Sequence, residues 1–327
     1  MMLFLWTPDL RKGRITLSSA FGILQNLLLT ITVLGLKAPT ETCMIGAREW
    51  NNSRDRSECH LPVGRVTMKI LFLGDVVAKC GREAVIRNIK SLKNEYGADF
   101  VIVNAENAAH GKGITASIYS RLTAAGADVI TLGNHAFSKK EIINQIDLCE
   151  NLVRPANLEP THIGQAYVVR ECFGKKIAVA SIMCEAFMCP VSRNPVDAMR
   201  KLLEEIRADL IIVDLHGEST GEKMTFTRYF RDQLTAVIGT HTHVQTADER
   251  LIDGCAFISD VGMCGAYDSI LGRDADEVMS HYIDKKLTRY TPACGPALIC
   301  GCLIETDDRT NRAVSITRIQ KRPNNAG

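Results

Sequence analysis

Eight residues of the kinds that bind metal ions or carry protons each follow a short apolar run of this sequence. They are Asp75, Glu106, Asn107, Asn134, His135, His216, His241 and His243. Short apolar runs that end at turn residues indicate buried strands. In open α/β sheets, ligands bind beyond the carboxyl ends of the strands. We therefore expect these side chains to meet at one rim of the fold.

Metal binding is the chemistry that this combination of carboxylates, amides and imidazoles favours. Each residue alone has an ordinary alternative, since Asp75 could cap a helix and Gly133-Asn134-His135 could be a simple turn. The pair His241 and His243 is more specific, because side chains two apart in an extended segment face the same way. Chance would rarely place ligand types at five separate strand ends, so the joint pattern predicts a metal site.

Strand and helix patterns alternate from Met68 onward, and this alternation predicts an α/β fold. Strands are expected at residues 70–73, 100–103, 129–132, 210–214, 236–238 and 256–258, and helices at 82–96, 116–125, 139–148 and 196–206. Ser138 is expected to cap the third helix. Two hairpins, 167–170 with 176–182 and 297–305 with 313–319, indicate mixed rather than parallel sheets.

Bulk composition excludes few functions. The 327 residues are 46% hydrophobic and carry a formal net charge of +2, so no strong field points to nucleic acid. The twelve cysteines form no paired CxxC spacing, and Cys300 and Cys302 fit alternating strand positions. Cys149, Cys184, Cys255 and Cys264 lie in apolar surroundings. We therefore expect reduced thiols and a cytoplasmic protein.

We expect residues 1–67 to be an N-terminal extension ahead of a domain of residues 68–327. Residues 15–36 carry no charged side chain, follow Arg11, Lys12 and Arg14, and are long enough to span a bilayer. Three interpretations remain open: a dispensable leader or over-extended start, a membrane anchor or export signal, and a helix packed on the domain. Residues 38–67 are polar and resemble a linker, and Met68 is a plausible natural start.

The order of these motifs resembles the calcineurin-like metallophosphoesterases, and in detail their YmdB-type bacterial branch. The motifs are Gly74-Asp75-Val-Val, Asn104-Ala-Glu106-Asn107, Gly133-Asn134-His135, Arg154-Pro-Ala-Asn157, Asp214-Leu-His216, Gly239-Thr-His241-Thr-His243 and Asp260-Val-Gly-Met263. The resemblance extends from Met68 to about Arg318. It implies a sandwich of two mixed β-sheets flanked by helices.

Two departures from the branch concern the surroundings of the site. Cys184-Glu185 stands where the branch commonly has Gly-Arg, and Ala136-Phe-Ser138 stands where it has Thr-Trp-Asp. Neither change removes a ligand. An acidic residue near a phosphate site would alter the contacts with substrate, so the substrate-binding residues are left unassigned.

The resemblance also implies a ligand set and a mechanism. Asp75, Glu106, Asn107 and His243 would hold one metal ion, and Glu106, Asn134, His216 and His241 would hold a second. Nitrogen and oxygen ligands without thiolate suit iron or manganese, and zinc less specifically; iron is the expected metal and manganese the alternative. Two such ions can share a hydroxide that attacks phosphorus. His135, which is no ligand in this scheme, would donate the proton to the leaving oxygen.

The expected function is hydrolysis of a small phosphodiester, a 2′,3′-cyclic or 3′,5′-cyclic nucleotide monophosphate. The alternatives are an RNA-directed phosphoesterase, a slow-turnover protein that senses nucleotides, and a metal-free α/β binding domain. A membrane partner is expected only if residues 15–36 are an anchor, and a homo-oligomer remains open. Asp214 and Asp260 either orient ligands or cap turns. The glycine-rich loop at His110 either approaches substrate or is simply a turn.

Overall fold

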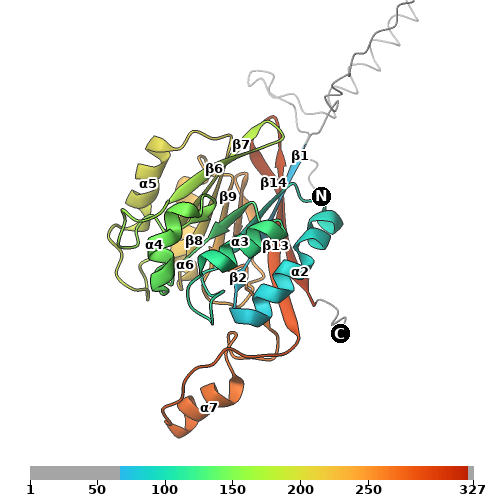
Figure 1. Ribbon diagram of the computed structural model, residues 1–327. Helices are drawn as coiled ribbons and strands as arrows, with labels where there is room; N and C mark the ends of the chain where they lie inside the picture. Colours follow the sequence, from blue (N-terminus) through green and yellow to red (C-terminus); the bar gives the residue numbers. More distant parts are fainter. Residues whose placement is uncertain (1–66, 323–327) are drawn as a thin grey trace, which may run out of the picture. The chain divides into compact units, whose positions relative to one another are not determined.

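The computed structural model of the chain describes residues 67–322, which contain two β-sheets packed face to face (Figure 1). The strands of the first sheet are β1 (Thr67–Leu73), β2 (Asp75–Val76), β3 (Phe100–Asn104), β4 (Val129–Thr131), β5 (Leu152–Val153), β12 (Met263–Ala266), β13 (Ala297–Asp307) and β14 (Arg312–Lys321). Their order is β2-β12-β13-β1-β3-β4-β5, with β14 paired to β13. Because β13 runs antiparallel to β1 while β1, β3, β4 and β5 are parallel, the sheet is mixed, as the sequence predicts.

The second sheet is mixed as well. Its strands are β6 (Tyr167–Cys172), β7 (Lys175–Met183), β8 (Leu210–His216), β9 (Ala236–Thr240), β10 (Arg250–Ile252) and β11 (Cys255–Ile258). They lie in the order β10-β11-β9-β8-β7-β6. The four central strands are parallel, and the edge strands β6 and β10 are antiparallel to their neighbours. Both hairpins expected from the sequence are present.

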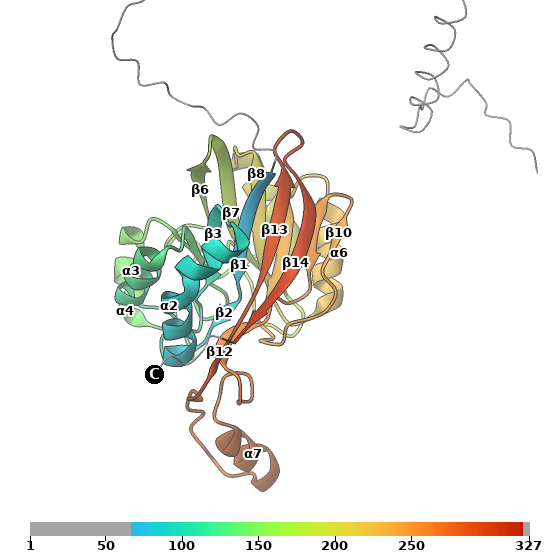
Figure 2. The ribbon, with the colours of Figure 1, turned by 90° about the vertical axis from the view of Figure 1, so that its right-hand side faces the viewer.

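Helices cover the outer face of each sheet (Figure 2). The helices are α2 (Ala78–Tyr96), α3 (Ala116–Ala125), α4 (Lys140–Gln145), α5 (Pro195–Glu205), α6 (Thr220–Phe230) and α7 (Ala275–Asp284). Buried residues of α2, α3 and α4 pack on the first sheet, and those of α5 and α6 pack on the second. A third cluster, which includes Phe72, Ile102, Ile212 and Ile238, fills the space between the sheets. This is the expected sandwich of two mixed sheets flanked by helices.

Several element boundaries differ from the sequence-based expectation. Helix α2 starts at Ala78 rather than 82, because its first turn packs on β12: a Cβ on Gly81 would lie 1.8 Å from the carbonyl oxygen of Cys264. The prediction that Ser138 caps α4 is wrong. The N-cap residue is Lys139, which makes no side-chain capping bond, and Ser138 Oγ lies 3.4 Å from Nδ1 of His135 instead.

The predictions about residues 1–66, including the apolar segment 15–36, lie outside the described residues. Among residues 67–322, no helix combines the length and apolar character that crossing a bilayer requires. The cysteines expected in apolar surroundings are indeed buried free thiols. They are Cys149, Cys184, Cys255 and Cys264, and the strand positions Cys300 and Cys302 are buried free thiols as well.

Candidate metal centre

One group of donor atoms surrounds Nε2 of His216. This nitrogen lies 2.8 Å from Oδ1 of Asn134, 3.1 Å from Nδ1 of His241 and 3.3 Å from Oε2 of Glu106. The four residues come from the ends of different strands. His216 is the last residue of β8, Asn134 follows β4, His241 follows β9, and Glu106 follows β3. Nitrogen and oxygen atoms at such separations can bind one cation together. The structure thus brings together the four residues expected to hold the second metal.

A second group shares Glu106 with the first. Ligand atoms of Asp75, Glu106 and His243 all lie within 4.8 Å of one another. The side-chain nitrogen of Asn107 donates to Oε1 of Glu106 at 2.8 Å and lies 3.1 Å from Nε2 of His243. A half-turn of this amide would present its oxygen to the same point, since the two amide orientations are nearly equal in shape. All seven expected ligands therefore converge on two adjoining positions.

The chemistry of the buried carboxylates fits cations. Asp75 is fully buried, and its Oδ1 atom has no hydrogen-bond partner. Burial, together with the negative charges of Glu106, Asp260 and Asp214, raises the pKa of Asp75 well above its ordinary value. Burial likewise raises the pKa of Glu106 to about 8. Acidic groups held in this way are stabilised as anions by bound cations.

The backbone of Gly133 passes close to the donor atoms, and the lack of a side chain there leaves space for them. Gly133 precedes Asn134, and a Cβ at this position would lie 2.4 Å from both Oε2 of Glu106 and Nε2 of His216. Any side chain there would displace two ligands, so the turn after β4 requires glycine. The segment forms a turn, and the geometry favours a role for Gly133-Asn134-His135 in the candidate site over that of an ordinary turn.

Asp214 is linked to the ligand candidate His216 through the hydroxyl of Thr240. It accepts hydrogen bonds from the side chains of Asn104, Thr131 and Thr240, at 2.8, 2.5 and 2.6 Å. The Thr240 hydroxyl lies 2.9 Å from Nδ1 of His216. Because the hydroxyl donates to Asp214, it accepts from Nδ1, which leaves Nε2 of His216 free as a ligand. Of the two roles expected for Asp214, the geometry favours the orienting one.

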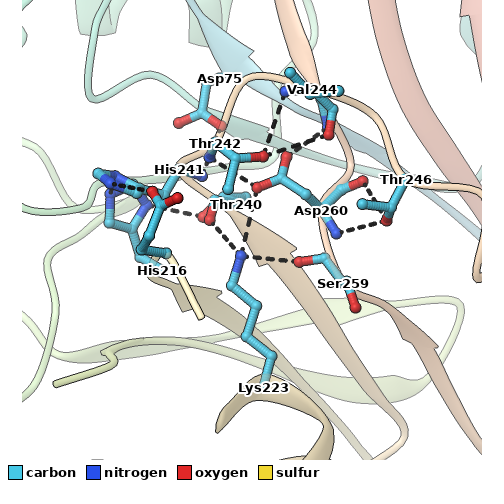
Figure 3. A network of polar contacts seen from close by, with 12 residues as sticks. Asp75, His216, Lys223, Thr240, His241, Thr242, Val244, Thr246, Ser259 and Asp260 are labelled. Carbon is cyan, nitrogen blue, oxygen red and sulfur yellow. Dashed lines mark hydrogen bonds and ion pairs between the residues drawn. The ribbon is translucent and has the colours of Figure 1, made fainter. Parts of the chain in front are cut away.

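A buried ion pair holds the segment that carries His241 and His243 (Figure 3). Lys223 in α6 is fully buried, and its Nζ atom donates to the carbonyl oxygens of Thr240 and Ser259, both at 2.8 Å. It also lies 3.4 Å from Oδ2 of Asp260, which accepts from the backbone nitrogen of Thr242 at 2.8 Å. Asp260 shows both expected roles, since Oδ2 holds the backbone between the two histidines and Oδ1 accepts from the backbone nitrogen of Gly262 at 2.9 Å.

This support is needed because the histidines have unusual backbone conformations. The φ angles of His241 and His243 are 107° and 66°, in the region that side-chain-bearing residues rarely adopt. Such strain persists only where surrounding contacts impose it. The sequence suggested two side chains facing the same way along an extended segment. The structure instead turns the chain at both residues, and each imidazole reaches a different donor group.

His135 lies beside the donor groups without belonging to either. Its Nε2 atom lies 3.5 Å from the side-chain nitrogen of Asn134. Burial, followed by the positive charges of groups that include Lys112 and Arg273, lowers the pKa of His135 to about 4. These charges also favour the approach of an anion. Lys112 and Arg273 were not singled out in the sequence, since single basic residues in loops carry no distinguishing pattern.

Arg154 and Asn157, which belong to the sequence motifs, have structural roles. The guanidinium of Arg154 donates to backbone carbonyls, including those of Ile163 and Pro155, and the amide of Asn157 bonds both N and O of Met183. His110 is exposed in a turn with a φ of 57°. The side chain of Glu185 is exposed, and its backbone nitrogen donates to Glu222.

Two sheets with helices outside, and carboxylate, amide and imidazole ligands at the strand ends, define a calcineurin-like metallophosphoesterase. The sequence profile of the YmdB-like protein family matches residues 71–319. The chain belongs to this family. A 2′,3′-cyclic-nucleotide 2′-phosphodiesterase of Bacillus subtilis (strain 168) is 43% identical over 255 residues, which cover 77% of this chain and 96% of that protein.

Solved structures agree with this assignment. A phosphatase from Mycoplasma pneumoniae has a TM-score of 0.74 and 34% identity, and the match covers 78% of this chain and 94% of that one. A hypothetical protein from Thermus thermophilus has a TM-score of 0.73 and 36% identity, with 78% and 99% covered. The expected enzyme class, a phosphoric diester hydrolase, is confirmed by the curated relatives.

Proposed function

We propose that the chain is a two-metal phosphodiesterase that opens 2′,3′-cyclic nucleotide monophosphates. The observation that carries this proposal is the position of Glu106, whose Oε2 atom faces His216 at 3.3 Å while Oε1 accepts from Asn107 at 2.8 Å. One carboxylate thereby belongs to both donor groups, as a bridging ligand must. The substrate class rests on the similarity to the Bacillus subtilis enzyme.

Iron is the proposed metal, with manganese as the alternative, because the ligands are nitrogen and oxygen atoms without thiolate. Two such cations would lower the pKa of water and neutralise the charge that develops on the phosphate. Asp75 and Glu106 supply two formal negative charges, so the loaded site would remain positive. A positive site attracts the monoanionic phosphodiester.

His135 is the proposed proton donor. It lies next to Asn134 but outside both donor groups, so its imidazole is free to reach a leaving oxygen. Cleavage of the bond between phosphorus and O2′ adds water to phosphorus and leaves an alkoxide at O2′, which needs that proton. The anionic phosphate beside the ring offsets the charges of Lys112 and Arg273, and restores the proton affinity of the imidazole.

The test combines metal analysis with a substrate panel. We expect two metals per chain, and metal-dependent hydrolysis of 2′,3′-cyclic AMP to 3′-AMP that exceeds hydrolysis of 3′,5′-cyclic AMP and single-stranded RNA. Glu106→Gln should lower both metal contents, because it weakens the shared ligand, while Glu95→Gln on the exposed end of α2 should change neither. One metal per chain would reject the two-metal site, and preference for RNA would reject the substrate class.

The proposed location is the cytoplasm. The buried thiols support a reducing compartment, since Cys184, Cys255, Cys264 and Cys302 are free in the structure. Burial raises the pKa of Cys184 and that of Cys255, both to about 12, so these thiols are also poor nucleophiles. They are consistent with packing roles rather than with catalysis.

A further inference from the structure

Residues 267–296, which we call the arm, connect β12 to β13 and carry helix α7. In both ribbon views α7 stands apart from the layers of the sandwich (Figures 1 and 2). None of the residues in α7 is buried. Every other α-helix in residues 67–322 has at least one buried residue. The arm therefore leaves a helix without the packing partner that stabilises the others.

The unpartnered helix is amphipathic. Its apolar residues Val278, Met279, Tyr282 and Ile283 follow the spacing that places side chains on one face. Met279 is 43% exposed, Tyr282 76% and Ile283 69%, and Leu287 just beyond the helix is 97% exposed. A contiguous apolar face of this kind marks a contact surface. Some other surface must cover it.

The charges of the arm indicate which surface that is. Asp276 and Glu277 lie in the first turn of α7, whereas Lys285 and Lys286 follow its last residue. Two copies of this helix placed antiparallel would bring the acidic end of each beside the basic end of the other. Two-fold symmetry produces this arrangement automatically. A membrane surface fits less well, because interfacial helices carry lysine and arginine on the polar face, and here that face is acidic.

Backbone hydrogen bonds brace the stem of the arm. Backbone bonds cross it from Ala293 to Gly272 at 2.9 Å and from Asp274 to Thr291 at 3.0 Å. The stem also reaches the metal centre, since Nδ1 of His243 lies 3.0 Å from the carbonyl oxygen of Leu271. A surface that is ordered before binding loses less entropy on association.

We propose that the arm is a homodimer interface, in which α7 packs antiparallel against α7 of a second copy. The apolar faces meet at the two-fold axis, and the charged ends form pairs across it. This interface does not depend on the proposed substrate or on the metals.

Sedimentation equilibrium of the full chain at micromolar concentrations tests the interface. We expect the unmodified protein to be dimeric, and Ile283→Asp to raise the dimer dissociation constant by about a hundredfold, because each interface would bury two new charges. Leu148→Asp is the matched control, since Leu148 is 79% exposed but lies outside the arm. It should leave the dimer intact. A monomeric parent chain, or an oligomer that Ile283→Asp leaves unchanged, would overturn the proposal.

Charge reversal tests the antiparallel arrangement. The pair Asp276→Lys with Glu277→Lys makes both ends of α7 basic, and the pair Lys285→Glu with Lys286→Glu makes both ends acidic. Each doubly substituted protein should self-associate less than the parent chain, whereas an equimolar mixture of the two should form heterodimers. Absence of heterodimers in the mixture would overturn the arrangement. If the chain associated through residues 1–66 instead, all the variants would associate as strongly as the parent chain. That result would also overturn the antiparallel arrangement.

Discussion

The Nζ atom of Lys223 lies 2.8 Å from the carbonyl oxygen of Thr240 and thereby ties helix α6 to the strand end that carries two metal-ligand candidates. A buried lysine in this position is costly unless it is well partnered. Here the second carbonyl, that of Ser259, and the carboxylate of Asp260 provide the remaining partners. The cost of burying this charge is offset by contacts that fix the backbone around His241.

Lys223→Met should therefore loosen the metal centre as well as destabilise the fold. Breaking a buried ion pair from one side costs about 3–5 kcal/mol, because Asp260 is left without its countercharge. We expect this loss in the free energy of unfolding, measured by denaturant titration, together with reduced metal content in the folded protein. Lys201→Met, on the exposed side of α5, is the control. Full metal content in folded Lys223→Met protein would show that Lys223 supports only the fold.

Thr240→Val isolates the contact between Asp214 and His216. Valine has nearly the shape of threonine but cannot donate to Asp214 or accept from Nδ1 of His216, which lie 2.6 and 2.9 Å from the hydroxyl. Loss of a group that orients a ligand typically weakens metal binding about 10–100-fold. Metal titration of the apoprotein measures this change. Thr225→Val in α6 removes only an exposed hydroxyl, and if it weakened binding equally the orienting role would be refuted.

The sequence indicated the candidate site more clearly than it indicated the supporting structure. The ligand candidates end strongly apolar strands, and the rule that ligands bind beyond strand ends places them together without any knowledge of sheet order. Gly133 and the His241–His243 pair gave local signals as well. Neither the second donor group nor the positive φ angles of the histidines could be read from spacing, because both arise from how two sheets meet.

Several elements were not predicted from the sequence, each for its own reason. Helix α6 buries Lys223 and Thr227 beside Phe226 and Phe230, so polar residues occupy positions that a hydrophobic pattern assigns to solvent. The two-residue strands β2 and β5 are too short for any periodicity. Helix α7 has a clear pattern but no partner in the described chain. Tertiary contacts, rather than local preference, decide the first two cases.

His135→Ala should reduce turnover while leaving the metals in place. His135 belongs to neither donor group, so its removal takes away a proton donor but no ligand. General acids typically contribute about 10²–10⁴-fold to rate, and we expect a loss in this range for 2′,3′-cyclic AMP. Turnover is measured at saturating substrate and metal content by elemental analysis. His162→Ala, which changes an exposed histidine, is the control. Unchanged turnover at full metal content would rule out proton donation by His135.

Removal of the metals should change how stability depends on pH. In the apoprotein, burial raises the pKa of Glu106 to about 8, against an ordinary value of 4.5, so the folded state holds a proton that the unfolded chain has released. The stability from this proton is lost as pH rises toward 8. Burial lowers the pKa of histidines such as His216, so their protonation changes stability only below their ordinary pKa of 6.5.

Between pH 6.5 and 8 the buried carboxylates therefore determine how the stability of the apoprotein depends on pH. Its free energy of unfolding should fall as pH rises, with a slope of up to about 1.4 kcal/mol per pH unit for each extra proton bound. Bound cations keep Asp75 and Glu106 ionised, so the metal-loaded protein should show little slope over this range. Denaturant titrations of the chelated and reloaded protein measure both slopes. Parallel curves would mean that these two carboxylates do not face the metals, because only direct contact with a cation abolishes their protonation.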